Sequence, residues 1–415
     1  MVSFIDMRRL TNASDIEGTI FWLSGLVEND EILAFAWESE GQYGSDPYGC
    51  TTTPNVYHSW LVKKSDIDAG GSYPVPHINL RGAECTDGWG VWFLYIPKKK
   101  WLYQSGFRGV SCSGTKFFTI YDISNPSSPK IIKDFQGTST SICGVYHAFY
   151  AEEVDKWLII ATDTLDAKIA TTDQLLNATS WDQLPNAPVK PTRDTCITLG
   201  GSKIICSGVI YDLKAETTSS FPDESVIGAS LNYVITTPNK WNENITVKWY
   251  KKTDLSLAYS QTTTFKHPPW RAHVIPDIDS VLIISYYQEA SDKVYVLKPD
   301  GTLLSFTLPR SVELRMLTRV NGFFVIATRD GYFSYLIPDS YLMIKKEAGK
   351  YVLRDMNNNP VSNKSVMICQ QSSIGSRDED YYGYDGCTTV TTDANGVIPI
   401  PSTFVGKSFI IIAPP

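Results

Sequence analysis

One short segment recurs along this chain and limits what the chain can fold into. Each copy is a turn, then a polar or basic residue, then four or five apolar residues that end in a small or hydroxyl side chain. The copies are "NDEILAFAW" (29–37), "KKWLYQS" (99–105), "DKWLIIATD" (155–163), "GSKIICSG" (201–208), "LNYVITT" (231–237), "DSVLIISYY" (279–287) and "NGFFVIATRDG" (321–331). Their mean spacing is about 48 residues, close to the roughly 40–50 residues of a four-stranded propeller blade.

The composition agrees with an all-β fold. The chain has 23 Tyr, 17 Phe and 11 Trp, and aromatic residues suit the pleated, half-buried surface of a sheet. Helical periodicity is almost missing, and Gly, Pro, Asn and Asp clusters separate the short apolar runs. We therefore predict a seven-bladed β-propeller over residues 1–340, with "VSFIDMRR" (2–9) completing the last blade and closing the ring.

Two segments within this region resemble known propeller repeats. "YDISNPSSPKII" (121–132) resembles the LVIVD-type repeat, in which a strand runs into an Asp and an Asn-Pro turn before a second strand. Pro126 and Pro129 lack amide donors, so the segment is predicted to be a turn at a blade edge. "TTDQLLNATSW" (171–181) resembles a loosened Asp-box hairpin, with Asp173 and Trp181 in the usual roles.

The last part of the chain has a different sequence pattern. A chain of 415 residues exceeds the roughly 250–300 at which one core stops growing, so two domains are expected. "NNNPVSN" (357–363) and "TTDANGVIPIP" (391–401) are similar to turns in carboxypeptidase-regulatory and bacterial Ig-like domains. The resemblance implies a small Ig-like β-sandwich over residues 341–415 that acts as a spacer or docking module.

The eight cysteines contain two suggestive pairs and no C-x-x-C motif. Cys196 and Cys206 flank "ITLGGSKII", and a three-residue hairpin loop would place them opposite each other, whereas a two-residue loop would misalign them. Cys369 and Cys387 are candidates to staple the C-terminal domain. Buried free thiols are the alternative for both pairs. Four glycosylation sequons occur, at Asn12, Asn177, Asn244 and Asn363.

Catalytic signatures are missing from the sequence. No G-x-S-x-G, H-E-x-x-H, P-loop or dinucleotide fingerprint occurs, so we assign no catalytic residue, no metal site and no cofactor. A propeller glycoside hydrolase of the sialidase kind is the alternative, because such enzymes gather carboxylates and arginines from separate blades. Its candidate residues would be Glu38, Glu84, Asp194 and Glu313, with Arg193, Arg271 and Arg319.

Two loops are the better candidates for a binding surface. "GQYGSDPYGCTTTPN" (41–55) and "EDYYGYDGCTTVTTDANG" (379–396) both combine Tyr, Gly and Asp before a Cys-Thr-Thr ending. Tyr offers a rigid amphipathic contact, and the same mixture of residues is found in antibody paratopes. The predicted binding residues are Tyr43, Tyr48, Tyr381, Tyr382, Tyr384 and Asp385. Packing of these loops on their own domains is the plainer alternative.

These features favour binding over catalysis. The net charge of −7 supplies no basic stripe for nucleic acid, no apolar run is long enough for membrane insertion, and no signal peptide is visible. Disulfides without an export signal would fit a virion component, such as a spike, tail or capsid-decorating protein, on the virion surface or otherwise extracellular. Its expected partners are a host-surface glycan or protein, and other virion proteins through the C-terminal domain. A cellular surface adhesin or scaffold is another alternative, and a homo-oligomer stays open.

Overall fold

The computed structural model describes most of the chain. The described residues are 4–9, 19–28, 31–40, 55–63, 66, 77–81, 91–110, 113–139, 144–199, 201–238, 243–265, 271–275, 279–284, 291–312, 314–320, 323–328, 333–338, 342–355, 357–370, 374–376 and 385–412.

The strands between Phe4 and Pro338 form antiparallel sheets that follow one another along the chain. The first three sheets contain β2 (Thr19–Glu28), β3 (Ile32–Glu40), β4 (Asn55–Lys63) and β5 (His77–Asn79); β6 (Trp92–Ile96), β7 (Trp101–Val110), β8 (Ser113–Asp122) and β9 (Lys130–Ser139); and β10 (Tyr146–Ala151), β11 (Lys156–Ala161) and β12 (Asp166–Thr171). The next two contain β13 (Cys196–Thr198), β14 (Lys203–Cys206), β15 (Val209–Asp212) and β16 (Thr217–Ser220); and β17 (Ser225–Ala229), β18 (Tyr233–Thr237), β19 (Asn244–Lys251) and β20 (Leu257–Thr264). The last two contain β21 (Arg271–Ile275), β22 (Ser280–Ile284), β23 (Ser291–Leu297) and β24 (Leu303–Val312); and β25 (Leu314–Val320), β26 (Phe323–Thr328) and β27 (Phe333–Pro338) with β1 (Phe4–Arg9).

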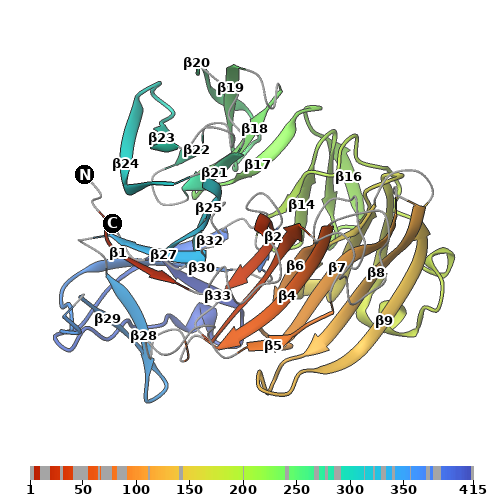
Figure 1. The fold of residues 1–415 in the computed structure, drawn as a ribbon, viewed down its shortest axis with the longest axis horizontal. Coiled ribbons are helices and arrows are strands. Elements are labelled where there is room, and N and C mark those ends of the chain that lie inside the picture. The colour runs from red at the N-terminus through yellow and green to blue at the C-terminus, as the bar shows by residue number, and fades with distance from the viewer. Residues whose placement is uncertain are drawn as a thin grey trace.

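These sheets are the blades of a β-propeller (Figure 1). The first strand of each sheet contacts the first strand of the next, from β2 through β6, β10, β13, β17 and β21 to β25, and β25 contacts β2 again. The N-terminal strand β1 pairs with β27, so the first strand of the chain completes the last sheet, as predicted. The described strands form seven such sheets; for the whole chain the count of seven blades stays a prediction.

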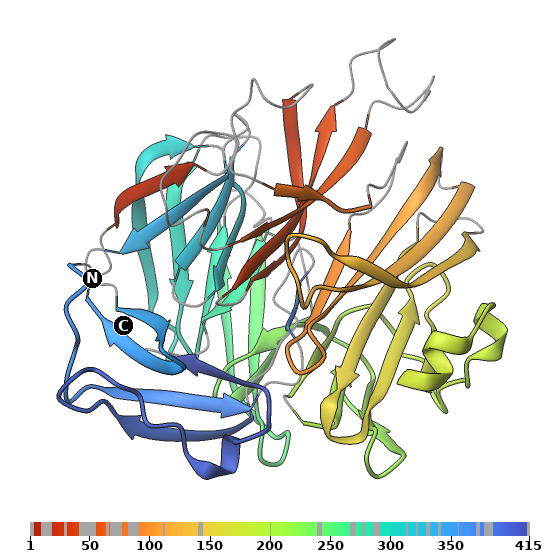
Figure 2. The same cartoon turned by 90° about the horizontal axis from the view of Figure 1, so that it is seen from below.

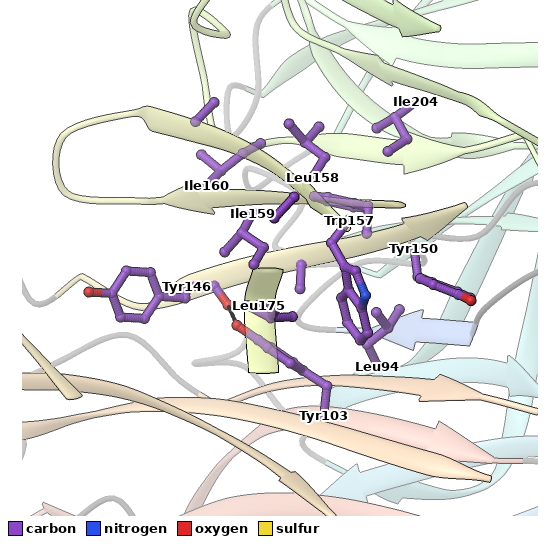
Figure 3. Close-up of a cluster of buried hydrophobic side chains, with 14 of the residues drawn as sticks. Leu94, Tyr103, Tyr146, Tyr150, Trp157, Leu158, Ile159, Ile160, Leu175 and Ile204 are labelled. Atoms are coloured by element: carbon purple, nitrogen blue, oxygen red, sulfur yellow. Dashed lines mark hydrogen bonds between the residues drawn. The ribbon is translucent and has the colours of Figure 1, made fainter. Parts of the chain in front are cut away.

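The recurrent sequence segment has one structural role. Each of its copies lies on the second strand of a different sheet: β3, β7, β11, β14, β18, β22 and β26. This strand has a neighbour on both edges and a sheet packed on both faces, which explains its run of apolar residues. Figure 3 shows the side chains from Trp157 to Ile160 of β11 in this setting, and all four are buried.

The strands of each sheet are connected antiparallel, so the turns between them lie on two opposite faces of the ring. We call the face where the innermost strands β6, β10 and β13 begin the start face, and the face where they end the end face. Because neighbouring strands alternate in direction, the turns between second and third strands lie on the start face. The turns between first and second strands, and those between third and fourth strands, lie on the end face.

The best described core lies between the sheets of β6–β9 and β10–β12. Tyr103 and Trp157 are fully buried there, together with Leu94, Phe118, Tyr146, Tyr150 and Leu175. The Tyr103 hydroxyl donates to the Tyr146 carbonyl oxygen at 2.9 Å, drawn as a dashed line in Figure 3. The Tyr103 ring therefore has its polar tip satisfied as well as its apolar body packed.

The third sheet departs from the regular pattern. Instead of a fourth strand it continues into helix α2 (Thr172–Asn177) and the 3₁₀ turn η3 (Trp181–Gln183). Thr171 and Gln174 form a capping box at the start of α2. The predicted Asp-box hairpin is therefore wrong: Asp173 lies in the first turn of a helix and Trp181 in η3. A T-x-x-Q cap followed by Leu-Leu favours a helix over a hairpin.

The "YDISNPSSPKII" segment is a turn, as predicted. It joins β8 to β9, where the Asp122 carboxylate accepts from the Ser124 amide at 2.9 Å. The Asn125 side chain accepts from the Ser127 amide at 3.1 Å. These local hydrogen bonds replace the ladder that the two prolines interrupt.

A C-terminal unit lies beside the propeller, at the bottom of Figure 2. It contains the pair β28 (Met343–Glu347) and β29 (Lys350–Arg354), and the sheet of β30 (Ser365–Gln370), β32 (Asp385–Thr391) and β33 (Phe409–Ile412). Its own core is built around Leu353, Ile368 and Phe404. The Ig-like identity of this unit and its boundary at residue 341 stay predictions.

One strand of this segment pairs outside the unit. β31 (Ile374–Ser376) joins the propeller by pairing with β6, so the C-terminal segment is not a detached spacer. No helix in the described part of the chain is long and apolar enough to cross a membrane.

Candidate binding site

Most of the predicted Tyr-Gly-Asp binding residues lie outside the part of the chain that the structure describes. Tyr43, Tyr48, Tyr381, Tyr382 and Tyr384 lie outside the described residues. Asp385 is the first residue of β32, with its Cα opposite that of Gln370. The strands that flank the first loop, β3 and β4, end at Glu40 and begin at Asn55 on the start face. The binding role of these residues therefore stays a prediction.

Both predicted cysteine pairs are disulfides. Cys196 and Cys206 are directly opposite in the β13–β14 hairpin, and the Leu199 amide bonds the Lys203 carbonyl oxygen. This register leaves a loop of residues 200–202, the three-residue loop that the bridge requires. Cys369 of β30 is bridged to Cys387 of β32. The four cysteines that the structure describes are thus all oxidised.

A buried ion pair joins the second and third sheets at the start face. Lys116 Nζ of β8 lies 2.7 and 2.8 Å from the two carboxylate oxygens of Asp163, which follows β11. The same ammonium lies 5.2 Å from the centre of the Tyr146 ring. Burial, and then the negative charge of Asp163, raise the pKa of the Tyr146 hydroxyl. The site therefore holds a fixed charge pair between two blades.

A stacked pair of rings ties three inner strands together. His147 of β10 is fully buried and stacks on Trp92 of β6, with ring centroids 4.4 Å apart. Its Nδ1 lies 3.2 Å from the carbonyl oxygen of Asp194, just before β13. Since the acceptor is a carbonyl, Nδ1 carries the proton of this hydrogen bond. His147 is thus a structural residue of the ring.

At the next blade junction the charged groups are partly exposed. Arg193 Nη1 donates to Ser225 Oγ at 3.0 Å, and its Nε lies 3.4 Å from Asp223 Oδ1. The same carboxylate oxygen accepts from Thr192 Oγ1 at 2.6 Å. This Arg–Asp pair joins the connection before β13 to the one before β17, both on the start face. A half-exposed pair of this kind can exchange its partner for a ligand group.

Directly beneath it lies a buried carboxylate. Glu224 accepts from Thr236 Oγ1 at 2.6 Å and from the Tyr250 hydroxyl at 3.2 Å, and it pairs with Lys248. Burial and the charge of Glu224 raise the pKa of Tyr250 to about 12. Glu224 therefore fixes the end of its own blade and is fully engaged within the protein.

Two exposed ion pairs mark the two faces. On the start face Lys190 pairs with Asp166, with side chains 62% and 40% exposed. A hydrogen bond from Lys190 is the main cause that lowers the pKa of Asp166. On the end face Lys214 pairs with Glu153, with side chains 60% and 42% exposed. The side chains of the two pairs are nearly equally exposed, so substitutions in one pair can serve as controls for substitutions in the other.

The C-terminal unit contacts the end face. Glu152, just after β10, is 6% exposed and accepts from Ser408 Oγ at 2.5 Å and from the Ser408 amide at 3.4 Å. Lys98 Nζ, just after β6, lies 3.6 Å from the same carboxylate. The contact occupies the end face of the second and third sheets, whereas the pairs of Lys190 and Arg193 lie on the opposite face.

The glycosidase alternative finds no assembled centre in the described part. Of its candidate residues, only Arg193 and Asp194 have described side chains, and their described contacts are the blade ties given above. Among the described residues, no group of three or more His, Cys, Asp or Glu is placed to hold a metal ion.

Sequence reasoning named Arg193 and Asp194 and missed the other charged residues that the structure places on this face. The pairs Lys116–Asp163 and His147–Asp194 are both separated by 47 residues, almost one repeat length. Lys116 lies on the third strand of its sheet, whereas Asp163 follows the second strand of the next sheet, and His147 bonds a backbone carbonyl oxygen. The sequence therefore has no signal for these contacts beyond the shared spacing.

Comparison with known proteins finds distant structural likenesses and no sequence relative. No protein-family model matches the chain, and no curated protein sequence matches it. Several solved propeller structures are similar to the chain. One is the WD40 domain of Toxoplasma gondii coronin, with 12% identity, a TM-score of 0.47 and coverage of 81% of this chain and 87% of that one. A catalytically inactive virginiamycin B lyase from Staphylococcus aureus has 9% identity, TM-score 0.46 and coverage of 80% and 99%. BamB from Moraxella catarrhalis has 12% identity, TM-score 0.38 and coverage of 81% and 100%.

Proposed function

We propose that this chain is a non-enzymatic recognition protein that binds through the start face of its propeller. The observation that carries the proposal is the asymmetry of the ring. The C-terminal unit contacts the end face through Ser408 and Glu152, while the start face presents the exposed groups of Lys190, Asp166 and Asp223.

The scaffold beneath that face supports recognition because its parts are fixed before binding. The Lys116–Asp163 pair and the Cys196–Cys206 bridge hold neighbouring strands in place. A site whose supporting groups are already ordered loses less entropy when a partner binds.

We further propose that the protein is a virion component, a spike, tail or capsid-decorating protein, that attaches to a host-surface glycan or protein. The two disulfides in the described part of the chain support a location outside the reducing cytosol. The C-terminal unit would then join the protein to other virion proteins.

The test is a binding assay on the full chain beside a hydrolysis assay on the same molecules. The protein is passed over a glycan panel and over host cells, and each glycan is analysed for cleavage. We expect saturable binding to at least one surface without turnover. Turnover of any glycoside would overturn the non-enzymatic assignment, and no saturable binding to any glycan or cell would overturn the attachment role.

A further inference from the structure

The strand β31 connects the C-terminal unit to the centre of the ring. It pairs antiparallel with β6, with Ile374 opposite Tyr95, Gly375 opposite Leu94 and Ser376 opposite Phe93. β6 is the innermost strand of its sheet, and β31 also contacts β2, the innermost strand of the preceding sheet. β31 therefore lies on the axis side of two neighbouring blades.

A disulfide closes the base of the segment that carries β31. Cys369 is near the end of β30 and Cys387 near the start of β32, and the pairing of these strands shifts register beside the bridge. Gly386 next to the bridge has φ of 55°, a left-handed conformation that glycine adopts without steric cost. The chain leaves the C-terminal unit at this point and returns to it within the disulfide loop.

The pairing of β31 is short, so a bridge at the base of its loop can add to its stability. Three residue pairs supply few hydrogen bonds, and these must offset the ordering of the whole loop. A bridge at the base holds the two ends together and lowers the entropy lost when the strand docks. Without the bridge, the end of the β30–β32 ladder can also open.

We propose that β31 is a latch between the C-terminal unit and the propeller, locked by the Cys369–Cys387 disulfide and released when an external dithiol reduces it. In that step the S–S bond breaks and each sulfur gains one electron and one proton. The dithiol supplies both electrons and both protons and becomes a disulfide. The latch is independent of what the start face binds.

The two disulfides that the structure describes differ in the way that such a latch requires. Cys196 and Cys206 are both fully buried on inner strands, whereas Cys387 is an exposed residue bridged to the buried Cys369. Thiol–disulfide exchange needs in-line access to one sulfur. Of these two bridges, a dithiol therefore reaches the one at the base of β31 first, and the buried bridge serves as an internal control.

Hydrogen exchange of the full chain tests the latch. The protein is treated with dithiothreitol under native conditions, alkylated and analysed by mass spectrometry. We expect Cys369 and Cys387 to be alkylated before Cys196 and Cys206. Peptides that contain Ile374–Ser376 and Trp92–Ile96 should then exchange about tenfold faster or more, because local opening no longer works against a closed loop.

Two variants separate the latch from general loosening. The double variant C369S/C387S should show the fast exchange without reductant. Gly375→Pro removes an amide from the middle of β31 and should speed exchange at Trp92–Ile96 with the bridge intact. Ser225–Ala229 of β17 should be unchanged in all cases. Alkylation of Cys369 and Cys387 without faster exchange, or equal acceleration at Ser225–Ala229, would overturn the proposal.

Discussion

Lys116 Nζ lies 2.7 Å from Asp163 Oδ1, and the two side chains are 9% and 0% exposed. The pair joins β8 of one blade to the residue that follows β11 of the next. The chain is closely packed around it: a Cβ added to Gly144 would lie 2.6 Å from Asp163 Cγ. A charge pair held this tightly between two blades fixes the distance between them.

Asp163→Ala is expected to lower the free energy of unfolding by about 3–5 kcal/mol, because it leaves the Lys116 ammonium buried without its carboxylate. Urea unfolding of the full chain measures the change. Asp166→Ala is the control, because it removes a carboxylate from an exposed pair with Lys190, and it should cost no more than about 1 kcal/mol. Equal costs for the two variants would mean that the buried pair does not stabilise the junction.

Gly137→Ala should destabilise the same junction through a steric clash. A Cβ at Gly137 of β9 would lie 2.1 Å from the Tyr146 hydroxyl oxygen and 3.4 Å from its Cζ. Tyr146→Phe removes only the closer atom, so the double variant should recover most of the stability that Gly137→Ala loses. A double-mutant cycle measured by thermal unfolding gives the coupling, and additive effects would contradict the contact.

Removal of the Cys196–Cys206 bridge should lower the free energy of unfolding by about 2–4 kcal/mol, the usual contribution of a disulfide. The double variant C196A/C206A keeps both positions small and apolar within a buried hairpin. Its melting temperature should fall below that of the oxidised protein. If the variant and the oxidised protein had the same melting temperature, the disulfide would not stabilise the hairpin.

Alkaline pH should unfold the propeller through its buried tyrosines. Burial raises the pKa of Tyr103, Tyr146, Tyr150 and Tyr211, and that of Tyr250 to about 12. In the unfolded chain these phenols ionise near pH 10, so their contribution is intact below about pH 10 and is lost as the pH rises further. Phenolate absorbance should show that these five tyrosines ionise above pH 10, at the same pH at which the protein unfolds. Reversible ionisation near pH 10 without loss of fold would contradict the burial.

The sequence was sufficient for the blade pattern because that pattern depends on local chemistry. The apolar segment with its leading turn marks the second strand of each described propeller sheet, and the three-residue loop after Leu199 places Cys196 opposite Cys206. The hairpin expected around Thr172–Asn177 rests on the resemblance of Asp173 and Trp181 to an Asp-box, and the capping box of Thr171 and Gln174 makes the segment a helix instead.

The contacts between distant segments could not be read in the same way. Ile374 pairs with Tyr95, which lies 279 residues earlier in the sequence, and a strand of three residues has too few positions to show a period. Ser408 meets Glu152 through its hydroxyl and its amide, and this contact has no signature in either local sequence. Which face the C-terminal unit contacts therefore emerged only from the structure.

The central claim is that the start face carries recognition, and a comparison of two charge reversals tests it most directly. Lys190→Glu changes the start face and Lys214→Glu changes the end face, at sites of nearly equal exposure. Both variants should keep the melting temperature of the parent protein, because exposed ion pairs contribute little to stability. With the glycan or cell that the parent binds, Lys190→Glu should weaken the dissociation constant about tenfold, whereas Lys214→Glu should leave it unchanged. Weakened binding by Lys214→Glu with no effect of Lys190→Glu would contradict the account and place recognition on the opposite face.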